Sequence, residues 1–188
     1  MAFFSPTGVL SNCTACQIHA GFFIAWHAVE ATIRRTFAHQ LCAYPDYRIV
    51  VTGHSLGAAV AALLGLSYEE QGLDPLVVTF GQPRVGNSAF AMHMDNVLVK
   101  TRRLMRVTHG NDPVVHIPPE AWGFRHHGVY RSSSSLLIIR VNTGSHQIMS
   151  LCCLQTSPSV TVMKIHHVFS DRYFIFSLMK LIIATEST

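Results

Sequence analysis

Charged residues are scarce in this sequence, and no part of it is an internal repeat. Asp, Glu, Lys and Arg together make up 13% of the 188 residues, whereas hydrophobic residues make up 49%. A composition this apolar excludes an intrinsically disordered chain, because such a chain can bury a large core. The length fits one such core, so residues 1–188 are expected to form a single domain.

The chain also lacks a concentrated basic surface. Its formal net charge is only +4, and the basic residues are scattered apart from a cluster at residues 100–103, which we interpret as the solvated edge of a strand. Nucleic-acid binding requires a dense patch or stripe of Lys and Arg. The sequence therefore predicts no nucleic-acid partner.

No apolar run is long enough to cross a bilayer. The apolar tail at residues 173–184 is interrupted by Lys180 and falls short of the roughly 20 residues that a membrane-spanning helix needs. We expect it to form a buried terminal helix or strand. The first residues of the chain lack the charged start and the long apolar stretch of a secretory signal. The sequence thus shows neither a transmembrane segment nor a signal peptide.

Cysteines are few, and their spacing permits three interpretations. Cys13 and Cys16 form a C-x-x-C pair that can be a redox pair, half of a zinc site or a local disulfide. A second such pair is absent, which argues against zinc, and no strand precedes the pair, which argues against a redox protein. A structural disulfide is favoured and would indicate an oxidising compartment. The count is odd, so at least one thiol is unpaired or paired outside this chain, and the others are Cys42, Cys152 and Cys153.

The most informative feature that is present is the pentapeptide G-H-S-L-G at residues 53–57. A β-branched run precedes it and an Ala/Leu-rich stretch follows it, so the pattern predicts a strand, a sharp turn and a helix. This is the context of a nucleophile elbow, in which Ser55 is exposed at the tip of a strained turn. The backbone N–H of Leu56 would then face a developing oxyanion at the start of the helix.

The surrounding sequence predicts alternating helices and strands. Helical spacing of apolar residues predicts a helix at 21–41, and the elbow helix is expected to run to about Glu70. Such alternation predicts a mostly parallel α/β sheet, with the site at the carboxyl ends of its strands. The remaining expected elements are a strand at 48–52, a strand at 76–80, a helix at 88–97 and a strand at 104–108.

A serine nucleophile needs a base, and the base needs an acid that orients it. Asp112 is the candidate acid because it follows the strand predicted at 104–108, although an Asp-Pro turn explains it equally well. The base is expected late in the chain, on a loop after the last strands, which favours His166 or His167. The histidines downstream of Asp112 are His116, His126, His127, His146, His166 and His167.

Four motifs resemble those of the fungal class 3 (triacylglycerol) lipases, a family that includes feruloyl esterases. They occur in the family's order, and together they are far more specific than the pentapeptide alone. The motifs are C-x-x-C-x-x-H-x-G-F at 13–22, the nucleophile strand and elbow at 45–59, F-G-x-P-R-x-G-N at 80–87 and the acid-bearing segment at 106–119.

This resemblance implies an α/β-hydrolase fold and the hydrolysis of carboxylic esters, above all triacylglycerols. It makes Ser55 the nucleophile, Asp112 the triad acid and the Leu56 N–H an oxyanion donor. The family's late H-x-x-[YF] motif matches residues 166–169, which makes His166 the base and leaves His167 as the alternative.

The resemblance further implies a disulfide between Cys13 and Cys16 and a secreted protein. It implies no metal and no cofactor. The implied partner is a lipid or other small ester, met at a lipid–water interface in the case of a lipase. A feruloyl esterase is the alternative within the family, and the G-[FY]-x-H segment ending at His126 implies that this histidine is not the base.

Two regions depart from the family pattern. The earlier strands, the oxyanion loop and the helical lid are not recognisable in residues 1–12. We therefore interpret the chain as N-terminally truncated and expect an exposed sheet edge. After residue 130 the pattern gives way to a serine tract at 132–135, which we interpret as a loop. An inactive lipase fragment is the second hypothesis, because losing one oxyanion donor costs on the order of a hundred- to a thousand-fold in rate.

Overall fold

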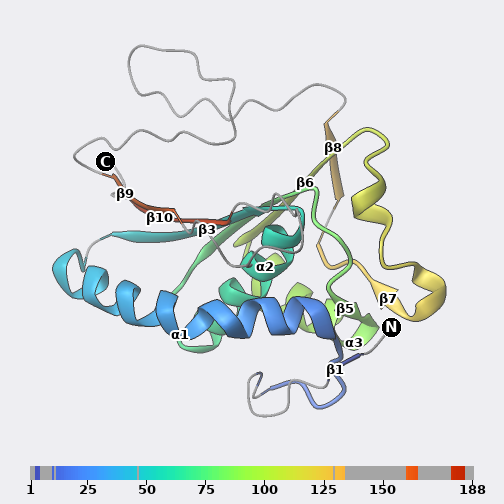
Figure 1. Ribbon diagram of the computed structural model, residues 1–188, viewed down its shortest axis with the longest axis horizontal. Coiled ribbons are helices and arrows are strands. Elements are labelled where there is room, and N and C mark those ends of the chain that lie inside the picture. The colour runs from blue at the N-terminus through green and yellow to red at the C-terminus, as the bar shows by residue number, and fades with distance from the viewer. Residues whose placement is uncertain are drawn as a thin grey trace, which may run out of the picture.

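A six-stranded sheet forms the centre of the structure, a computed structural model that describes residues 3–4, 10, 12–45, 47–128, 130–133, 160–164 and 179–184 (Figure 1). Across the sheet the strands follow the order β8-β6-β4-β3-β10-β9. Their bounds are Arg48–His54 for β3, Leu76–Phe80 for β4, Leu104–His109 for β6, Tyr130–Ser133 for β8, Val160–Lys164 for β9 and Met179–Ala184 for β10.

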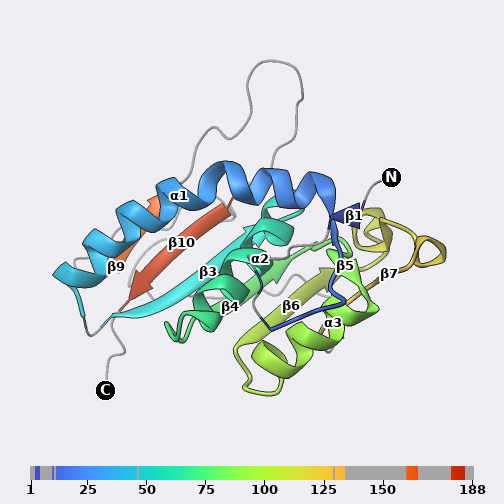
Figure 2. The same cartoon turned by 90° about the horizontal axis from the view of Figure 1, so that it is seen from below.

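Four neighbouring strands, β8, β6, β4 and β3, are parallel. Helix α2 (Leu56–Glu70) connects β3 to β4, and α3 (Ser88–Met94), continued by a π-helical turn at Asp95–Val99, connects β4 to β6. Both helices lie on the same face of the sheet (Figure 2). The mostly parallel α/β sheet predicted from the sequence is therefore confirmed. The strands can be parallel because each helix returns the chain to the end of the sheet where the preceding strand began.

Among the described strands, the end of the sheet on this side is β9 and not the nucleophile strand β3. Strand β10 pairs antiparallel with β3 along six residues, from Met179 opposite Gly53 to Ala184 opposite Arg48. Strand β9 then pairs with the other edge of β10. Strand β3 is covered because its backbone groups need partners on both sides, and the apolar C-terminal run supplies the second set.

Two further expectations are corrected. Ser132 and Ser133 do not lie in a loop, because they belong to β8 and pair with β6. The hydrogen bonds of the sheet outweigh the weak preference of serine for loops. Residues 100–103 are not a strand edge but the turn before β6. Within that turn, the Arg103 guanidinium forms ion pairs with Glu69 and Asp74.

The longest helix, α1 (Ala20–Ala43), matches the helix predicted at 21–41. Its buried residues recur at helical spacing, and they face α2 and the sheet. Near its C-terminal end Phe37 stacks on Tyr68 of α2, with ring centroids 5.1 Å apart. The buried residues of α1 are Ala25, Trp26, Val29, Ile33 and Phe37.

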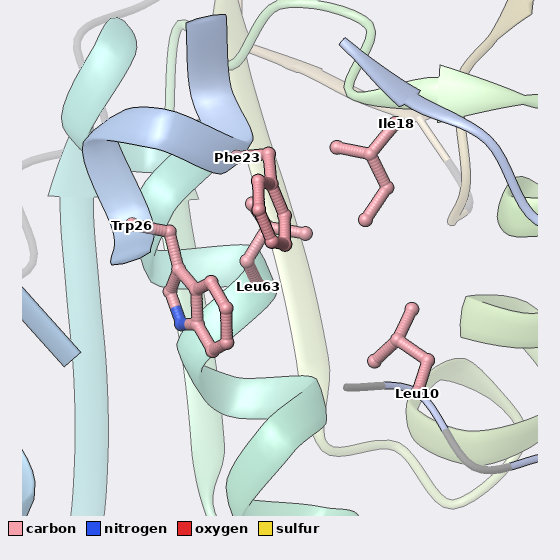
Figure 3. A pocket seen from close by; sticks show the side chains of 5 residues that line it. All are labelled: Leu10, Ile18, Phe23, Trp26 and Leu63. Atoms are coloured by element: carbon pink, nitrogen blue, oxygen red, sulfur yellow. The ribbon is translucent and has the colours of Figure 1, made fainter. Parts of the chain in front are cut away.

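A small apolar hollow remains between the start of α1, α2 and the segment before α1 (Figure 3). Its volume is about 10 Å³, which is about the least that holds one water molecule. We therefore treat it as a packing gap rather than a ligand site. It is lined by Leu10, Ile18, Phe23, Trp26 and Leu63.

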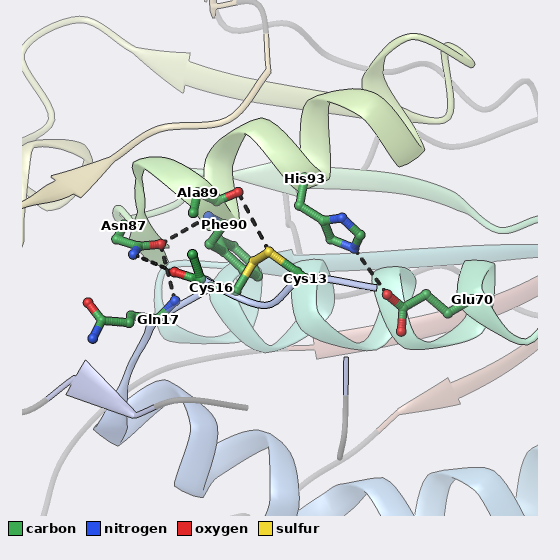
Figure 4. The surroundings of a disulfide bond; sticks show 9 residues. Cys13, Cys16, Gln17, Glu70, Asn87, Ala89, Phe90 and His93 are labelled. Atoms are coloured by element: carbon green, nitrogen blue, oxygen red, sulfur yellow. Dashed lines mark hydrogen bonds and ion pairs between the residues drawn. A yellow bond between two sulfur atoms is a disulfide. The ribbon is translucent and has the colours of Figure 1, made fainter. Parts of the chain in front are cut away.

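A second, antiparallel sheet of two-residue strands has the order β1-β2-β5-β7. Asn87 joins this sheet to α3: its Oδ1 accepts the N–H groups of Gln17 and Phe90, and its Nδ2 donates to Ala15 O (Figure 4). One side chain thus ties the N-terminal segment to the region that follows β4. The strands are Phe3–Phe4, Ile18–His19, Gly86–Asn87 and Phe124–Arg125.

Among the described residues, no helix combines the length and the apolar character needed to cross a membrane.

Truncation of Phe37 tests the packing of α1 on α2. We expect Phe37→Ala to lower the free energy of unfolding by about 3–5 kcal/mol, because it empties a site that is only 2% exposed. Urea unfolding followed by circular dichroism measures the change. Thr36→Ala, on the exposed side of the same helix, is the matched control and should stay within about 0.5 kcal/mol. Equal effects of the two substitutions would contradict this packing.

Candidate active site

Ser55 occupies the sharp turn between β3 and α2. Its φ is 55° and its ψ is −124°, a conformation that favours glycine and costs a non-glycine residue of the order of 1–3 kcal/mol. Its N–H donates to Phe80 O at 3.0 Å. Its hydroxyl makes no capping bond to the helix among the residues that the structure describes. The strained turn predicted at this serine is present.

A close backbone approach makes this turn possible. A Cβ on Gly53 would lie 2.2 Å from Gly57 O and 2.8 Å from Ala58 N. No other residue type fits at Gly53 without displacing the start of α2. The glycine at the first position of the pentapeptide therefore allows the last residues of β3 and the first turn of the helix to lie against each other.

Helix α2 begins at Leu56, immediately after Ser55. The first N–H groups of an α-helix have no acceptor within the helix, and the helix dipole places partial positive charge there. The Leu56 N–H belongs to this group of N–H groups, and its role as an oxyanion donor stays a prediction.

Asp112 lies in the loop that follows β6 and precedes a 3-10 turn at Pro113–His116. Its Oδ1 accepts the Val114 N–H at 2.9 Å. Its Oδ2 lies 2.9 Å from the point that a Cβ on Gly81 would occupy, and Gly81 has a φ of 55°. A side chain at Gly81 would therefore collide with the Asp112 carboxylate.

The two predicted site residues lie at the same edge of the sheet. The Ser55 N–H bonds to Phe80 O, and the Gly81 N–H bonds to Val107 O at 2.9 Å, so the β4 end separates the β3 and β6 ends. Two strand spacings amount to about 10 Å. The region over Gly81 holds the Asp112 carboxylate and the ring of His54, whose Nε2 lies 3.5 Å from the point that a Cβ on Gly81 would occupy.

Two of the candidate histidines are held neutral by burial. Burial, with the nearby Arg106 charge, lowers the pKa of His126 to about 4. Burial, with the charges of Arg106 and His126, lowers the pKa of His127 to about 3. His126 Nε2 donates to Val115 O at 2.7 Å. Both histidines are therefore structural at neutral pH, and His116 is exposed.

The two favoured bases and one weaker candidate, His166, His167 and His146, lie outside the described residues.

A buried polar network beneath the site was not foreseen from the sequence. His127 is fully buried, and its Nε2 lies 3.1 Å from Gln82 Nε2. Arg106 Nε donates to His127 O at 3.2 Å. The one signal that could have revealed this network was Arg106, a charged residue at a core position of a predicted strand.

Cys13 and Cys16 form a disulfide with a Cα–Cα separation of 5.5 Å (Figure 4). The local disulfide favoured from the sequence is therefore present. Cys42 is an exposed free thiol, whereas Cys152 and Cys153 lie outside the described residues. In the part of the chain that the structure describes, no three His, Cys, Asp or Glu side chains are grouped to hold a metal ion.

The family model described as "Lipase (class 3)" matches residues 2–122. The chain therefore belongs to the class 3 lipase family. It is 42% identical over 111 residues to "Secreted mono- and diacylglycerol lipase 1" of Fusarium solani, a match that covers 59% of this chain and 32% of that protein. It is 38% identical over 118 residues to "Lipase" of Rhizopus oryzae, with 60% and 29% covered. The chain thus spans about a third of the length of these curated relatives.

Solved structures of fungal lipases have the same fold. The lipase from Rhizopus microsporus var. chinensis matches with a TM-score of 0.62 and 34% identity, over 70% of this chain and 45% of that chain. A triacylglycerol lipase whose structure was described as having a serine protease triad as its catalytic centre matches with a TM-score of 0.60 and 36% identity, over 68% and 47%. The described sheet and helices are therefore part of an α/β-hydrolase fold, as expected from the sequence.

Replacement of both paired cysteines tests the disulfide. We expect Cys13→Ser with Cys16→Ser to lower the free energy of unfolding by about 2 kcal/mol, because the unfolded chain gains the freedom that a short closed loop removes. Urea unfolding measures this change. Thiol titration of the denatured protein before and after reduction is the check. The gain in thiols on reduction should be two larger for the wild-type chain than for the variant, and equal gains would contradict the pairing.

The buried histidines predict acid sensitivity. Their folded-state pKa lies below the unfolded value, so stability is complete above about pH 6.5 and falls as the pH drops toward 4. His127 alone should contribute a slope of about 1.4 kcal/mol per pH unit.

Urea unfolding between pH 7 and pH 4 measures this slope. His127→Gln should reduce it, whereas the matched control His39→Gln, on the exposed side of α1, should leave it as in the wild type. An unchanged slope in His127→Gln would show that His127 is not held neutral by burial.

Proposed function

We propose that this chain carries the catalytic centre of a serine ester hydrolase that acts on acylglycerols, with Ser55, Asp112 and His166 as its triad. One observation carries the proposal. Ser55 lies in a strained conformation at the turn from β3 to α2, and its hydroxyl makes no capping bond to the helix. The Asp112 carboxylate follows β6, two strands away, and Gly81 at the end of β4 lies between them. A structural turn would not need a strained non-glycine residue at this point.

The proposed chemistry follows from these positions. His166 takes the Ser55 Oγ proton as that oxygen attacks the ester carbonyl carbon, and the Leu56 N–H binds the oxyanion that forms. The protonated imidazole then gives its proton to the leaving alcohol, and an acyl-serine ester remains. Water attacks this ester with the same base, which releases the carboxylic acid and restores Ser55. Asp112 orients the imidazole and stabilises its charged form, and no metal or cofactor takes part.

Strand β9 ends at the same edge of the sheet as the nucleophile strand β3. Lys164, the last residue of β9, lies opposite Lys180 of β10, and Lys180 lies opposite Thr52 of β3. The chain therefore leaves β9 at the edge that carries Ser55. Strand β9 is two strand spacings from β3, about 10 Å, on the side away from Asp112.

This sheet order sets the reach that the base needs. His166 and His167 follow Lys164 by two and three positions, and each residue extends the chain by at most about 3.5 Å. Two residues therefore reach at most about 7 Å and three at most about 10 Å, whereas β9 lies about 10 Å from β3. We keep His166 as the proposed base on the family motif, and His167, with one more residue of reach, is its alternative.

The names of the relatives favour acylglycerols over feruloyl esters. Two of them are called secreted mono- and diacylglycerol lipases, and others are called lipases. We therefore propose that the substrate is an acylglycerol, met at a lipid–water interface, and that the protein is secreted. The disulfide between Cys13 and Cys16 supports an oxidising compartment.

Covalent labelling tests the proposal. A fluorophosphonate ester reacts only with a serine that a base activates. We expect the wild-type chain to gain the mass of one probe adduct, Ser55→Ala to gain none, and Asp112→Asn to react more slowly by a factor on the order of 10⁴. Intact-mass spectrometry over time measures all three. His166→Ala and His167→Ala identify the base, since only one of them should abolish labelling.

The same experiment separates the two hypotheses. Failure of a folded wild-type chain to react would mean that Ser55 is not activated, which is the expectation for an inactive lipase fragment. If Ser55→Ala still gained the adduct, the nucleophile would be another residue. A reactive chain can then be assayed with matched acylglycerol and feruloyl esters, and faster release of the feruloyl acid would favour the alternative substrate.

A further inference from the structure

Four successive carbonyl groups in the loop after Asp112 accept hydrogen bonds from just two residues. Val115 O accepts from His126 Nε2 at 2.7 Å. The other three accept from Arg84: His116 O and Pro118 O from its guanidinium Nη1, the latter at 3.0 Å, and Ile117 O from its backbone N–H at 2.9 Å. Among the described strands none pairs with this segment, and Arg84 donates to three of its four carbonyl oxygens.

Arg84 is only 8% exposed. Its Nη2 also forms an ion pair with Glu120 Oε1 at 3.1 Å. Burial of a guanidinium is costly unless its donors are used; here Nη1 and Nη2 are bonded, whereas Nε has no partner among the described residues. The planar group can reach several acceptors at once, which a lysine ammonium cannot do in the same geometry. The side chain therefore fits a role as a cross-link between the loop after β4 and the loop after β6.

The position of Asp112 depends on how the loop after β4 packs against the loop after β6. Asp112 Oδ1 accepts the Val114 N–H within the loop that Arg84 holds, and its Oδ2 lies over Gly81, three residues before Arg84. A shift of either loop would move the carboxylate relative to the turn that carries Ser55.

We propose that Arg84 is a positioning residue for the triad acid: it holds the loop of Asp112 against the loop of Gly81 and so fixes the carboxylate that orients the base. The proposal rests on the proposed function, because it assigns a task to Arg84 in that chemistry. Arg84 touches neither the substrate nor the reacting atoms in this scheme.

Rates of fluorophosphonate labelling, divided by the folded fraction, test this role. We expect Arg84→Met to slow labelling on the order of ten- to a hundred-fold, because a displacement of about 1 Å at a catalytic group can cost that much. Arg84→Lys should lie between Arg84→Met and the wild type. Arg103→Met is the matched control: it removes a guanidinium with two ion pairs at the opposite end of β6 and should leave the rate unchanged.

Two readouts separate positioning from a loss of stability. In an Asp112→Asn background, Arg84→Met should slow labelling no further, since both changes act through one carboxylate. The acid limb of the pH–rate profile should move to lower pH in Arg84→Met, because a base that loses its carboxylate partner has a lower pKa. Equal slowing in both backgrounds, with an unmoved profile, would overturn the proposal.

A measurement that does not depend on activity completes the test. Amide hydrogen exchange of Val114 reports the bond to Asp112 Oδ1 directly. We expect Arg84→Met to speed exchange at Val114 by at least ten-fold and Arg103→Met to leave it unchanged. If the wild-type chain does not react with the probe, the proposed function fails, but unchanged exchange at Val114 in Arg84→Met would still refute the role of Arg84.

Discussion

Two backbone hydrogen bonds at the carboxyl edge of the sheet hold the candidate active site together. The Ser55 N–H donates to Phe80 O, and the Gly81 N–H donates to Val107 O. They extend the pairing of three parallel strands beyond the regular ladder into the turns that follow them. Since Ser55 belongs to one turn and Asp112 to another, the separation of these residues depends on these bonds. The strain at Ser55 persists because the sheet fixes the chain on both sides of it.

Irregular backbone next to a site needs donors and acceptors that sheets and helices do not supply. In this chain, side chains supply them. Arg84 and His126 satisfy the loop after β6, and Asn87 satisfies the N-terminal segment that carries the disulfide. These residues lie within motifs that the chain shares with the family, yet what they bind is mainly backbone. Part of the family pattern thus encodes the support of the site rather than its chemistry.

Much of the fold was predictable because its signals are local. The helix of α1 follows from the spacing of Val29, Ile33 and Phe37, and the elbow follows from two glycines and a serine between a β-branched run and an alanine-rich run. The failures concern long-range pairing. Ser132 and Ser133 have loop-like composition, but β6 recruits them into the sheet. The edge of β3 looked open because its partner, β10, lies more than a hundred residues further along the chain.

The sequence by itself determined the family, the elements around Ser55, the candidate acid Asp112 and the pairing of Cys13 with Cys16. Each of these depends on residues close together in the chain or on motifs in a recognisable order. Only the tertiary structure decided that β10 covers β3, that Gly81 separates Ser55 from Asp112, and that burial makes His126 and His127 structural. The reason is physical: strand pairing, burial and the pKa shifts that burial causes depend on neighbours that the fold brings from distant positions.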